Sequence, residues 1–398
     1  MKPTSSANGP LPDSPTPAAA GARPAPQPAR REVAGSVIVL VLVTVLLAAF
    51  LLTRFVERAG TELLADARAG TRERLRGEAY SALEVTLAVL ADVRAIDNGL
   101  HSPAQGWDRP LEYADYTPGE GRTVEVSFED ESGKISLPKA SADTLATLLE
   151  SFGLEQSDAE KVTDALLVWI RTDHEPATLE AGADTYERAS LPHHPAQRPL
   201  RSFGELAAIK FVREAFFDEQ GQPNQLLHEF ESSVSLFSFD RSNLNASPLS
   251  VMTAAGLDSG QIDGLKDYVR RQKLAQGPGY FTAMSEVSAI VGGNAPIKGF
   301  GTDVQALRVI VTVREGAALY RLSAVISPPG GAIVAPAPAA ATAATAATVG
   351  PNLSSGTGST AETAAPVIKK LDYPFKVLEI REDVESMATP PADAAEHD

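Results

Sequence analysis

Carboxylate side chains gather in a proline-rich stretch of the sequence between residues 173 and 200. They belong to Asp173, Glu175, Glu180, Asp184 and Glu187, and His174 lies among them. Oxygen ligands carried by an irregular loop suit Ca²⁺, which takes roughly six to eight of them. The spacing differs from that of an EF-hand loop. We therefore take Asp173, Glu175 and Asp184 as candidate calcium ligands, with a solvated acidic loop that binds no metal as the alternative.

A second chemical signal is the pair Gly35-Ser36, which stands directly before a long apolar run. A prepilin peptidase requires a small residue at the cut and a helix that continues into the bilayer. Basic residues upstream, here Arg30 and Arg31, hold such a leader in the cytoplasm. We predict cleavage between Gly35 and Ser36. The fifth residue after this cut is Leu40, whereas most pilin-like proteins carry Glu at that position.

Other reactive combinations are weak or missing. His193 and His194 are adjacent in a loop between prolines, and two neighbouring side chains rarely converge on one metal ion without further His or Cys ligands. The sequence contains no cysteine, and no Gly-x-Ser-x-Gly, P-loop or His-Glu-x-x-His motif. We expect no catalytic residues and no enzymatic activity.

The overall charge argues against a nucleic-acid partner. The 398 residues include 51 acidic and 35 basic side chains, which gives a net charge of −16. Phosphate backbones repel such a chain. Hydrophobic residues make up 43% of the sequence, enough for a sizeable core, and the length predicts about two or three domains. The lack of cysteine is compatible with an oxidising compartment.

The element that must position the cleavage site is an apolar segment from Val33 to Thr53, in which no residue is charged. A helix needs about 20 such residues to cross the hydrocarbon core, so the segment predicts a single membrane-spanning helix. A signal peptide, the alternative, carries its small residues after the apolar region, whereas Ala34-Gly35-Ser36 comes before it. Arginines flank both ends of the segment and leave its orientation open.

The helix is expected to continue beyond the membrane to about Ile96, because no proline interrupts it and one apolar stripe runs along it. The stripe consists of Leu75, Ala79, Leu83, Leu87 and Leu90. The points of lowest helix propensity are Gly60, Gly70 and Gly77.

Strand patterns lie on both sides of a helical block. Residues 122–129 alternate between apolar and polar and predict a strand. Residues 304–313 and 317–326 predict a hairpin whose turn is 314–316, and residues 373–380 predict a last strand. We therefore expect an α+β fold with an antiparallel sheet that closes around a helical insertion.

The helical block is internally duplicated. Residues 141–172 predict two helices, and further helix is expected to about residue 275. Each copy has a helix, a Gly-Leu turn at Gly153 or Gly256, and a second helix, and glycine at these turns fits a left-handed helix end. A helix pair around such a turn resembles the helix-hairpin-helix module that binds DNA. Acids beside both turns favour packing or protein contact instead.

These patterns divide the chain into segments. In order they are a disordered leader at 1–35, a transmembrane helix with its continuation at 36–100, a β region at 120–136 and 302–327, an inserted helical domain at 137–292, a linker rich in alanine and threonine at 328–366, a final strand at 367–382 and a disordered tail at 383–398.

Three stretches in the middle of the chain carry a family resemblance. They run from Asp164 through Trp169 to Pro176, from Gly182 to Tyr186, and from Pro192 through Arg198-Pro199-Leu200 to Glu205-Leu206. The run Asn243-Leu244-Asn245-Ala246 adds a fourth match. These motifs resemble those of the general secretion pathway protein K family, the large minor pseudopilins of type II secretion systems. The resemblance covers about residues 30–290.

The resemblance implies a pilin-like sheet that carries a large helical insertion with SAM-like repeats. It also implies an acidic calcium-binding region and the lack of Glu at the fifth mature position. It places the leader in the cytoplasm, the anchor in the cell inner membrane and the body in the periplasm. The implied partners are prepilin peptidase and the minor pseudopilins of classes H, I and J. The implied function is to cap the tip of the pseudopilus and help initiate its assembly.

Some features depart from the family pattern. Arg171 and Thr185 stand where the family tends to have acids, and the leader is long. Two alternative functions follow from the patterns above. One is a minor pilin of a type IV pilus, against which the inserted helical domain argues. The other is a membrane-anchored DNA receptor, against which the acidic turns argue.

Overall fold

The computed structural model describes residues 34–177, 186–188, 194–275, 277–292, 297, 299–336 and 374–382. Outside these residues lie nearly all of the predicted leader at 1–35, most of the linker at 328–366 and the whole tail at 383–398. The chain divides into two compact units, Met1–Ala67 and Arg68–Asp398.

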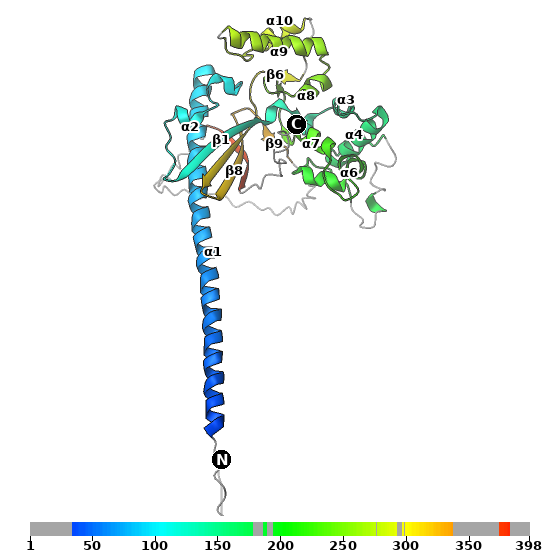
Figure 1. Ribbon diagram of the computed structural model, residues 1–398. Coiled ribbons are helices and arrows are strands. Elements are labelled where there is room, and N and C mark those ends of the chain that lie inside the picture. The colour runs from blue at the N-terminus through cyan, green and yellow to red at the C-terminus, as the bar shows by residue number, and fades with distance from the viewer. Residues whose placement is uncertain are drawn as a thin grey trace, which may run out of the picture. The chain divides into compact units, whose positions relative to one another are not determined.

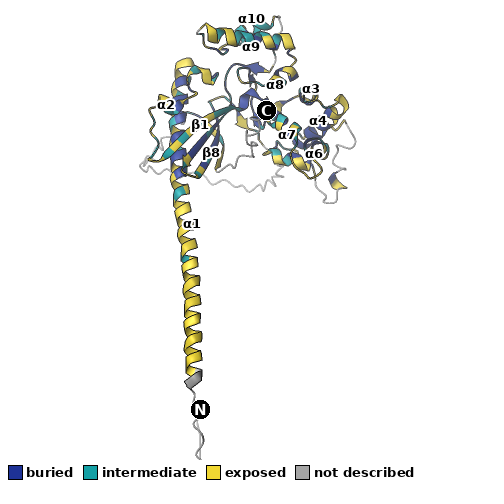
Figure 2. Cartoon of the chain, in the orientation of Figure 1, coloured by how far each residue is buried: buried dark blue, intermediate teal, exposed yellow. Residues whose placement is uncertain are grey.

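The first unit contains the amino-terminal part of helix α1, which runs from Ala34 to Asp97 without interruption. The continuous helix predicted from residue 33 to about 96 is therefore confirmed, and the glycines within it do not break it. Large apolar side chains from Val37 to Leu64 are exposed, as the yellow part of α1 in Figure 2 shows. Among the described helices, α1 alone is long and apolar enough to cross a membrane.

In the second unit, the remaining part of α1 packs against a β-sheet through the predicted stripe. All five stripe residues are buried, with exposures between 0% and 3%. They share a core with Val309, Val311, Tyr320 and Leu322 of the sheet. Trp107, which is fully buried, meets Phe128 edge to face at 4.9 Å in the same core.

The sheet has four antiparallel strands in the order β1-β7-β8-β10. Their bounds are Arg122–Asp130 for β1, Leu307–Glu315 for β7, Ala318–Ser327 for β8 and Lys376–Glu382 for β10. Strand β1 pairs with β7 from Arg122↔Glu315 to Asp130↔Leu307, so sheet neighbours come from opposite sides of a long insertion. Figure 1 shows β1 and β8 lying against α1.

The predicted hairpin is present with shifted limits. Strand β7 begins at Leu307 rather than 304, because the Val304 amide bonds to the Leu100 carbonyl instead of a strand. The turn is Gly316-Ala317 rather than 314–316, since Glu315 still pairs with Ala318. A two-residue hairpin loop needs positive φ, which Gly316 adopts at 59°. The final strand lies two to three residues later than predicted.

The second face of the sheet has its own small core. Phe237 and Phe239 pack against Val325 and Ala332 there, and Leu378 of β10 lies against them. The pair β4 (Phe237–Ser238) and β9 (Ile333–Val334) is antiparallel and lies beside this core. Helix α1 thus packs on one face of the sheet, and the β4 segment covers the other face only at β8 and β10, since Thr123 and Glu125 of β1 are exposed there.

The segment between β1 and β7 is mainly helical. Its helices are α3 (Ala142–Ser151), α4 (Gln156–Ile170), α6 (Lys210–Phe216), α7 (Gln225–Ser233), α8 (Leu249–Ala254), α9 (Ser259–Leu274) and α10 (Met284–Val291), with 3-10 turns η2 (Glu131–Gly133), η3 (Leu137–Lys139) and η5 (Phe203–Ala208). A single hydrophobic core joins them, centred on residues such as Leu148, Leu166, Phe216 and Phe230. The α+β fold with a helical insertion is confirmed.

The expectation of helix up to about residue 275 is wrong for residues 234–243. Three two-residue strands, β3 (Val234–Ser235), β4 and β5 (Ser242–Asn243), interrupt the helices. Val234-Ser235-Leu236 and Phe237-Ser238-Phe239 each place one serine between bulky residues, a pattern that suits short pieces of extended chain. Strand β3 pairs with β2 (Ile135–Ser136) and β5 with β6 (Phe300–Gly301), both in parallel.

Two helix ends share one hydrogen-bonding pattern. After α3, the Gly153 amide bonds to the Glu150 carbonyl and the Leu154 amide to the Leu149 carbonyl. After α8, Gly256 and Leu257 make the same bonds to Thr253 and Met252. Both glycines have positive φ, 96° and 88°, as this helix end requires. The carboxylate of Asp258 then caps α9 by accepting from the Gln261 amide at 2.8 Å.

Candidate functional site

The predicted cleavage residues Gly35 and Ser36 lie in the first turn of α1, which begins at Ala34. The chain therefore enters the helix immediately before the predicted cut. From Val37 onward the exposed apolar surface continues for about five turns of helix, the length that a membrane span needs.

Hydrogen bonds from α4 hold the first residues of the acidic loop in place. Asp164 of α4, which is 6% exposed, bonds to Nε2 of His174 at 2.8 Å and accepts from the Ala177 amide at 3.1 Å. These bonds fold the start of the loop back onto the helix. Asp173 and Glu175, on either side of His174, are exposed.

Among the residues that the structure describes, no hydrogen bond or ion pair holds the side chains of Asp173 and Glu175. Asp184 and His193 lie outside the described residues. His194 bonds to Glu187 at 3.4 Å, and both are exposed. Within the described ranges, no group of three or more acidic or histidine side chains could hold a metal ion. The described part of the loop thus contributes two available carboxylates.

The far end of the acidic loop is anchored by aromatic packing. Tyr186 is 3% exposed and meets Trp169, the last but one residue of α4, at 5.4 Å and 63°. Burial raises the pKa of Tyr186, consistent with a hydroxyl kept from water. Trp169 and Tyr186 therefore hold the two ends of the loop together.

The Arg-Pro-Leu-x-Ser-x-x-Glu-Leu run forms a local clasp. The Arg198 guanidinium pairs with the Glu205 carboxylate at 3.1 Å. The same carboxylate accepts from the Arg201 amide at 2.9 Å. Leu200 and Leu206 are buried at 5% and 0% exposure. The motif therefore fixes the chain between the acidic loop and η5.

Two asparagines of the Asn243-Leu244-Asn245-Ala246 motif connect several segments of the chain through side-chain hydrogen bonds. Asn243 is fully buried, and its Nδ2 donates to the His101 carbonyl at 2.8 Å and to the Asp130 carboxylate at 2.7 Å. Asn245 donates to the carbonyls of Phe281 and Thr302 at 3.0 and 3.1 Å. These bonds connect the end of α1, the end of β1, the α9–α10 connection and β6.

Comparison with known proteins identifies the central segment. Residues 127–219, which include the acidic loop and the Arg198–Glu205 clasp, match the first domain of "Type II secretion system (T2SS), protein K". This segment is therefore similar to the first domain of type II secretion system protein K. No curated protein matches the chain by sequence.

The fold of the chain is also similar to that of a solved structure. A chain in the crystal structure of the GspK-GspI-GspJ complex from the enterotoxigenic Escherichia coli type 2 secretion system matches with a TM-score of 0.50 and 13% identity. The match covers 80% of this chain and 98% of that chain. The likeness therefore extends well beyond the protein K segment and concerns the α+β architecture.

Buried charges tie the protein K segment to the sheet. Arg308 of β7 bonds to Glu131 at 2.6 Å and to Glu379 of β10 at 3.2 Å. Lys134 also approaches Glu131, at 3.5 Å. Burial alone would raise the pKa of Glu131, but Lys134 and Arg308 together hold it below its usual value. The sequence pattern offered no signal for this network, since its members lie up to 248 positions apart in separate segments.

Proposed function

We propose that this chain is the large minor pseudopilin of a type II secretion system, and that it caps the tip of the periplasmic pseudopilus and helps initiate its assembly. The observation that carries the proposal is the match of residues 127–219 to protein K. The long amino-terminal helix and the sheet that closes around a helical insertion support it. The mechanism is assembly rather than catalysis.

The exposed part of α1 supports a role in helix packing. Beyond the apolar run, Val56, Leu63 and Leu64 remain 61–70% exposed, although charged residues now fill the other faces. Apolar residues on one stripe of a charged helix suit contact with another helix. We propose that these residues pack beside the helices of the minor pseudopilins of classes H, I and J.

The helical insertion supports a terminal position in the fibre. The insertion adds a large body to a helix and sheet that would otherwise resemble an ordinary pilin subunit. A body of this size would obstruct a subunit stacked above it. Leu40 at the fifth position would also leave the mature amino terminus of a neighbour without a carboxylate partner. Both features fit the topmost subunit, anchored first in the inner membrane with its body in the periplasm.

The decisive experiment is to determine the mature amino terminus of membrane-extracted protein by intact mass and N-terminal sequencing. The proposal requires prepilin peptidase to cut after Gly35, so the mature chain should begin at Ser36. The Gly35→Val variant should keep its leader. Gly60→Ala is the matched control, since a methyl group there meets nothing within 4 Å, and it should be processed normally. A chain that still begins at Met1 contradicts the assembly mechanism.

We further propose that the acidic loop binds Ca²⁺ through Asp173 and Glu175, with Asp184 as a third ligand. The two described carboxylates are exposed and available, as a calcium site requires. A bound ion would pair with the loop carboxylates. It would also rigidify the loop, which the Trp169–Tyr186 contact and the Asp164–His174 bond already fix. The Arg171 guanidinium donates to the Pro138 and Ala140 carbonyls, so within the described residues it does not neutralise Asp173 or Glu175.

Thermal unfolding with and without calcium tests this proposal. At 100 times the dissociation constant, a bound ion stabilises the fold by about 2.7 kcal/mol. Calcium should therefore raise the melting temperature, and EDTA should reverse the rise. The Asp173→Asn, Glu175→Gln double variant should lose the response, while the exposed Glu219→Gln control should keep it. An equal response in all three proteins would contradict a site at these residues.

A further inference from the structure

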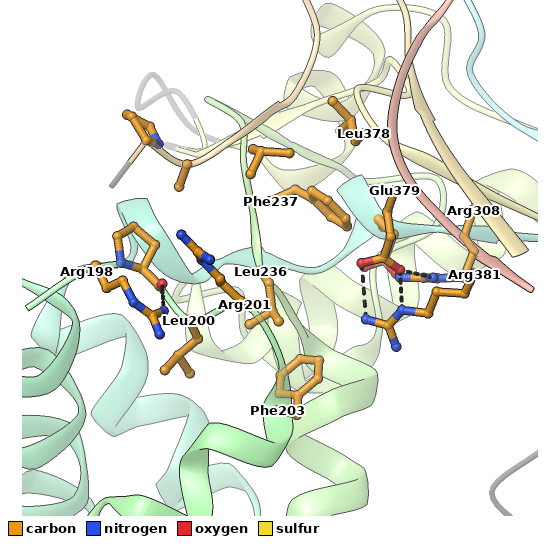
Figure 3. A pocket seen from close by; sticks show the side chains of 15 residues that line it. Arg198, Leu200, Arg201, Phe203, Leu236, Phe237, Arg308, Leu378, Glu379 and Arg381 are labelled. Carbon is orange, nitrogen blue, oxygen red and sulfur yellow. Dashed lines mark hydrogen bonds and ion pairs between the residues drawn. The ribbon is translucent and has the colours of Figure 1, made fainter. Parts of the chain in front are cut away.

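A cavity of about 460 Å³ lies beside β10, and residues 198–200 at the end of the acidic loop form part of its wall. Its walls come from residues 198–203, from β4, from residues 334–336 and from β10. Figure 3 shows side chains from these four segments facing a common space. None of the residues assigned above to processing, calcium binding or helix packing lines it.

The charge of this cavity differs from that of the chain. Four arginines line it, Arg198, Arg201, Arg308 and Arg381, against the two acids Glu131 and Glu379. The excess of arginine in the lining is opposite in sign to the net charge of the whole chain, which is −16. The lining therefore favours an anionic ligand group.

The two acids do not compensate for all four arginines. Glu131 is bound by Arg308 and Lys134. Glu379 is bound by Arg308 and by Arg381, the latter at 2.8 Å, as the dashed lines in Figure 3 indicate. Arg198 pairs with Glu205, which lies outside the cavity lining. These ion pairs account for three of the four arginines in the lining.

The fourth guanidinium belongs to Arg201. Among the residues that the structure describes, none forms a hydrogen bond or ion pair with it, although its backbone amide is fixed by Glu205 at 2.9 Å. Figure 3 shows the Arg201 side chain between Arg198 and Leu236 without an interaction to the other residues drawn. A guanidinium is always charged and binds a carboxylate through two parallel N–H groups.

The remaining lining is apolar. Leu200 and Phe237 are buried, and Phe203, Leu236 and Leu378 are half-buried around them. Strand β10 stands at the edge of the sheet, and among the described strands it pairs only with β8. An edge strand beside an apolar cavity can add an extended segment through main-chain hydrogen bonds.

From these observations we propose that the cavity binds an extended acidic peptide segment of a partner protein. A carboxylate of the segment pairs with Arg201, and the apolar side chains next to that carboxylate occupy the space between Phe203, Leu236 and Leu378. The negative charge of the rest of the chain disfavours longer polyanions such as nucleic acids. The proposal rests on the cavity alone and is independent of the pseudopilin assignment.

The test uses the full chain in detergent micelles and two fluorescein-labelled peptides with acetylated and amidated ends. One is Val-Leu-Glu-Phe-Asp-Leu-Val, and the other carries Gln and Asn in place of Glu and Asp. Fluorescence anisotropy should show that the acidic peptide binds about tenfold more tightly than its amide counterpart, the loss expected for one charge-assisted pair. Arg201→Gln should reduce the affinity for the acidic peptide by a similar factor.

Arg270→Gln is the matched control, because Arg270 is exposed on α9 and does not line the cavity. It should bind the acidic peptide as the unaltered chain does. Equal binding of the two peptides, or an unchanged affinity in Arg201→Gln, would overturn the proposal. A chain shortened by residues 383–398 adds one further outcome. Binding that appears only in this shortened chain would mean that the chain's own acidic residues take the place of the partner, which also overturns the proposal.

Discussion

The side-chain nitrogen of Asn243 and the carboxylate of Asp130 form a 2.7 Å hydrogen bond at the point where the sheet meets the helical insertion. The same nitrogen reaches the carbonyl of His101, directly after α1. A single amide thus joins the ends of α1 and β1 to a residue that lies more than 100 positions away from both in sequence. Its environment leads to several predictions.

The Asn243→Ala variant should lose about 3 kcal/mol of unfolding free energy. It removes the Asn243 donor from the His101 carbonyl and from Oδ2 of Asp130, whereas Oδ1 of Asp130 keeps its bonds from Ser132, and each lost bond to a buried group costs about 1–3 kcal/mol. Guanidinium unfolding of the chain in micelles measures the change. The exposed Gln225→Ala control should remain within about 0.5 kcal/mol of the unaltered chain.

The two tryptophans add a second readout for the Asn243→Ala variant. Trp107 lies in the core between α1 and the sheet, and Trp169 lies in the core of the helical insertion. In chains that keep Asn243, the Trp107→Phe and Trp169→Phe variants each leave one tryptophan, and the fluorescence of the two variants should show coincident unfolding transitions. With Asn243 replaced, the two transitions should separate, since one of the buried bonds that couple the cores is gone. Coincident transitions in the variant would contradict this coupling role.

Asp130 should make stability depend on pH. Burial raises its pKa to about 6, although bonds from Ser132 and Asn243 oppose the rise. An acid whose folded pKa exceeds its unfolded value of about 3.9 favours the folded state when protonated. Its contribution is present below about pH 4 and is lost as the pH rises through about 6, with a size of at most about 3 kcal/mol.

The measurement is the unfolding free energy of the unaltered chain minus that of Asp130→Asn, determined between about pH 4 and pH 7.5. This difference should fall as the pH rises, because only the carboxyl group titrates. The Glu125→Gln variant, at an exposed position of the same strand, serves as the reference for pH effects from the rest of the chain. A flat difference would show that Asp130 does not titrate in this range.

Gly133→Ala should destabilise the chain by about 1–3 kcal/mol through overpacking. A methyl group on Gly133 would stand 2.8 Å from the carbonyl oxygen of Ala246, which is backbone and cannot rotate away. The Gly204→Ala variant is the matched control, as its methyl group would stand 3.6 Å from the nearest atom. Thermal melting of both variants measures the two losses of stability. Equal losses in Gly133→Ala and Gly204→Ala would contradict overpacking at Gly133.

Glu78→Gln should destabilise the packing of α1 on the sheet by about 3 kcal/mol. The Glu78 carboxylate is 8% exposed and pairs with Arg122 of β1. It also accepts from the Tyr116 hydroxyl at 2.5 Å. Its loss leaves the Arg122 charge half-buried without its main partner. Trp107 fluorescence follows the unfolding of this core, and the exposed Glu73→Gln variant should show little change.

The fold was predictable where local patterns repeat. The stripe through Leu75 and Leu90 has the period of a helix, and residues 122–129 have the period of a strand, so α1 and β1 were expected close to their observed limits. The parallel pairs β2–β3 and β5–β6 could not be expected, because each strand has two residues and its partner lies far away in sequence.

The candidate sites follow the same division. Gly35 and Ser36 were found from the apolar run that follows them, and Asp173 and Glu175 from local charge density. The roles of Asn243 and Arg201 depend on which distant groups the fold brings near them. Both lie in motifs that the sequence marks, but no period or spacing encodes those neighbours.

The direct pairing of Asp130 with Leu307 has a consequence for how the chain folds. Closing β1 onto β7 brings together residues far apart in sequence, which costs entropy that grows with the length of free chain between them. Helices α3 to α10 reduce this cost if they have already collapsed, since they draw the two strands together. The insertion should therefore form early and the sheet late, with pairing of β1 and β7 limiting the rate.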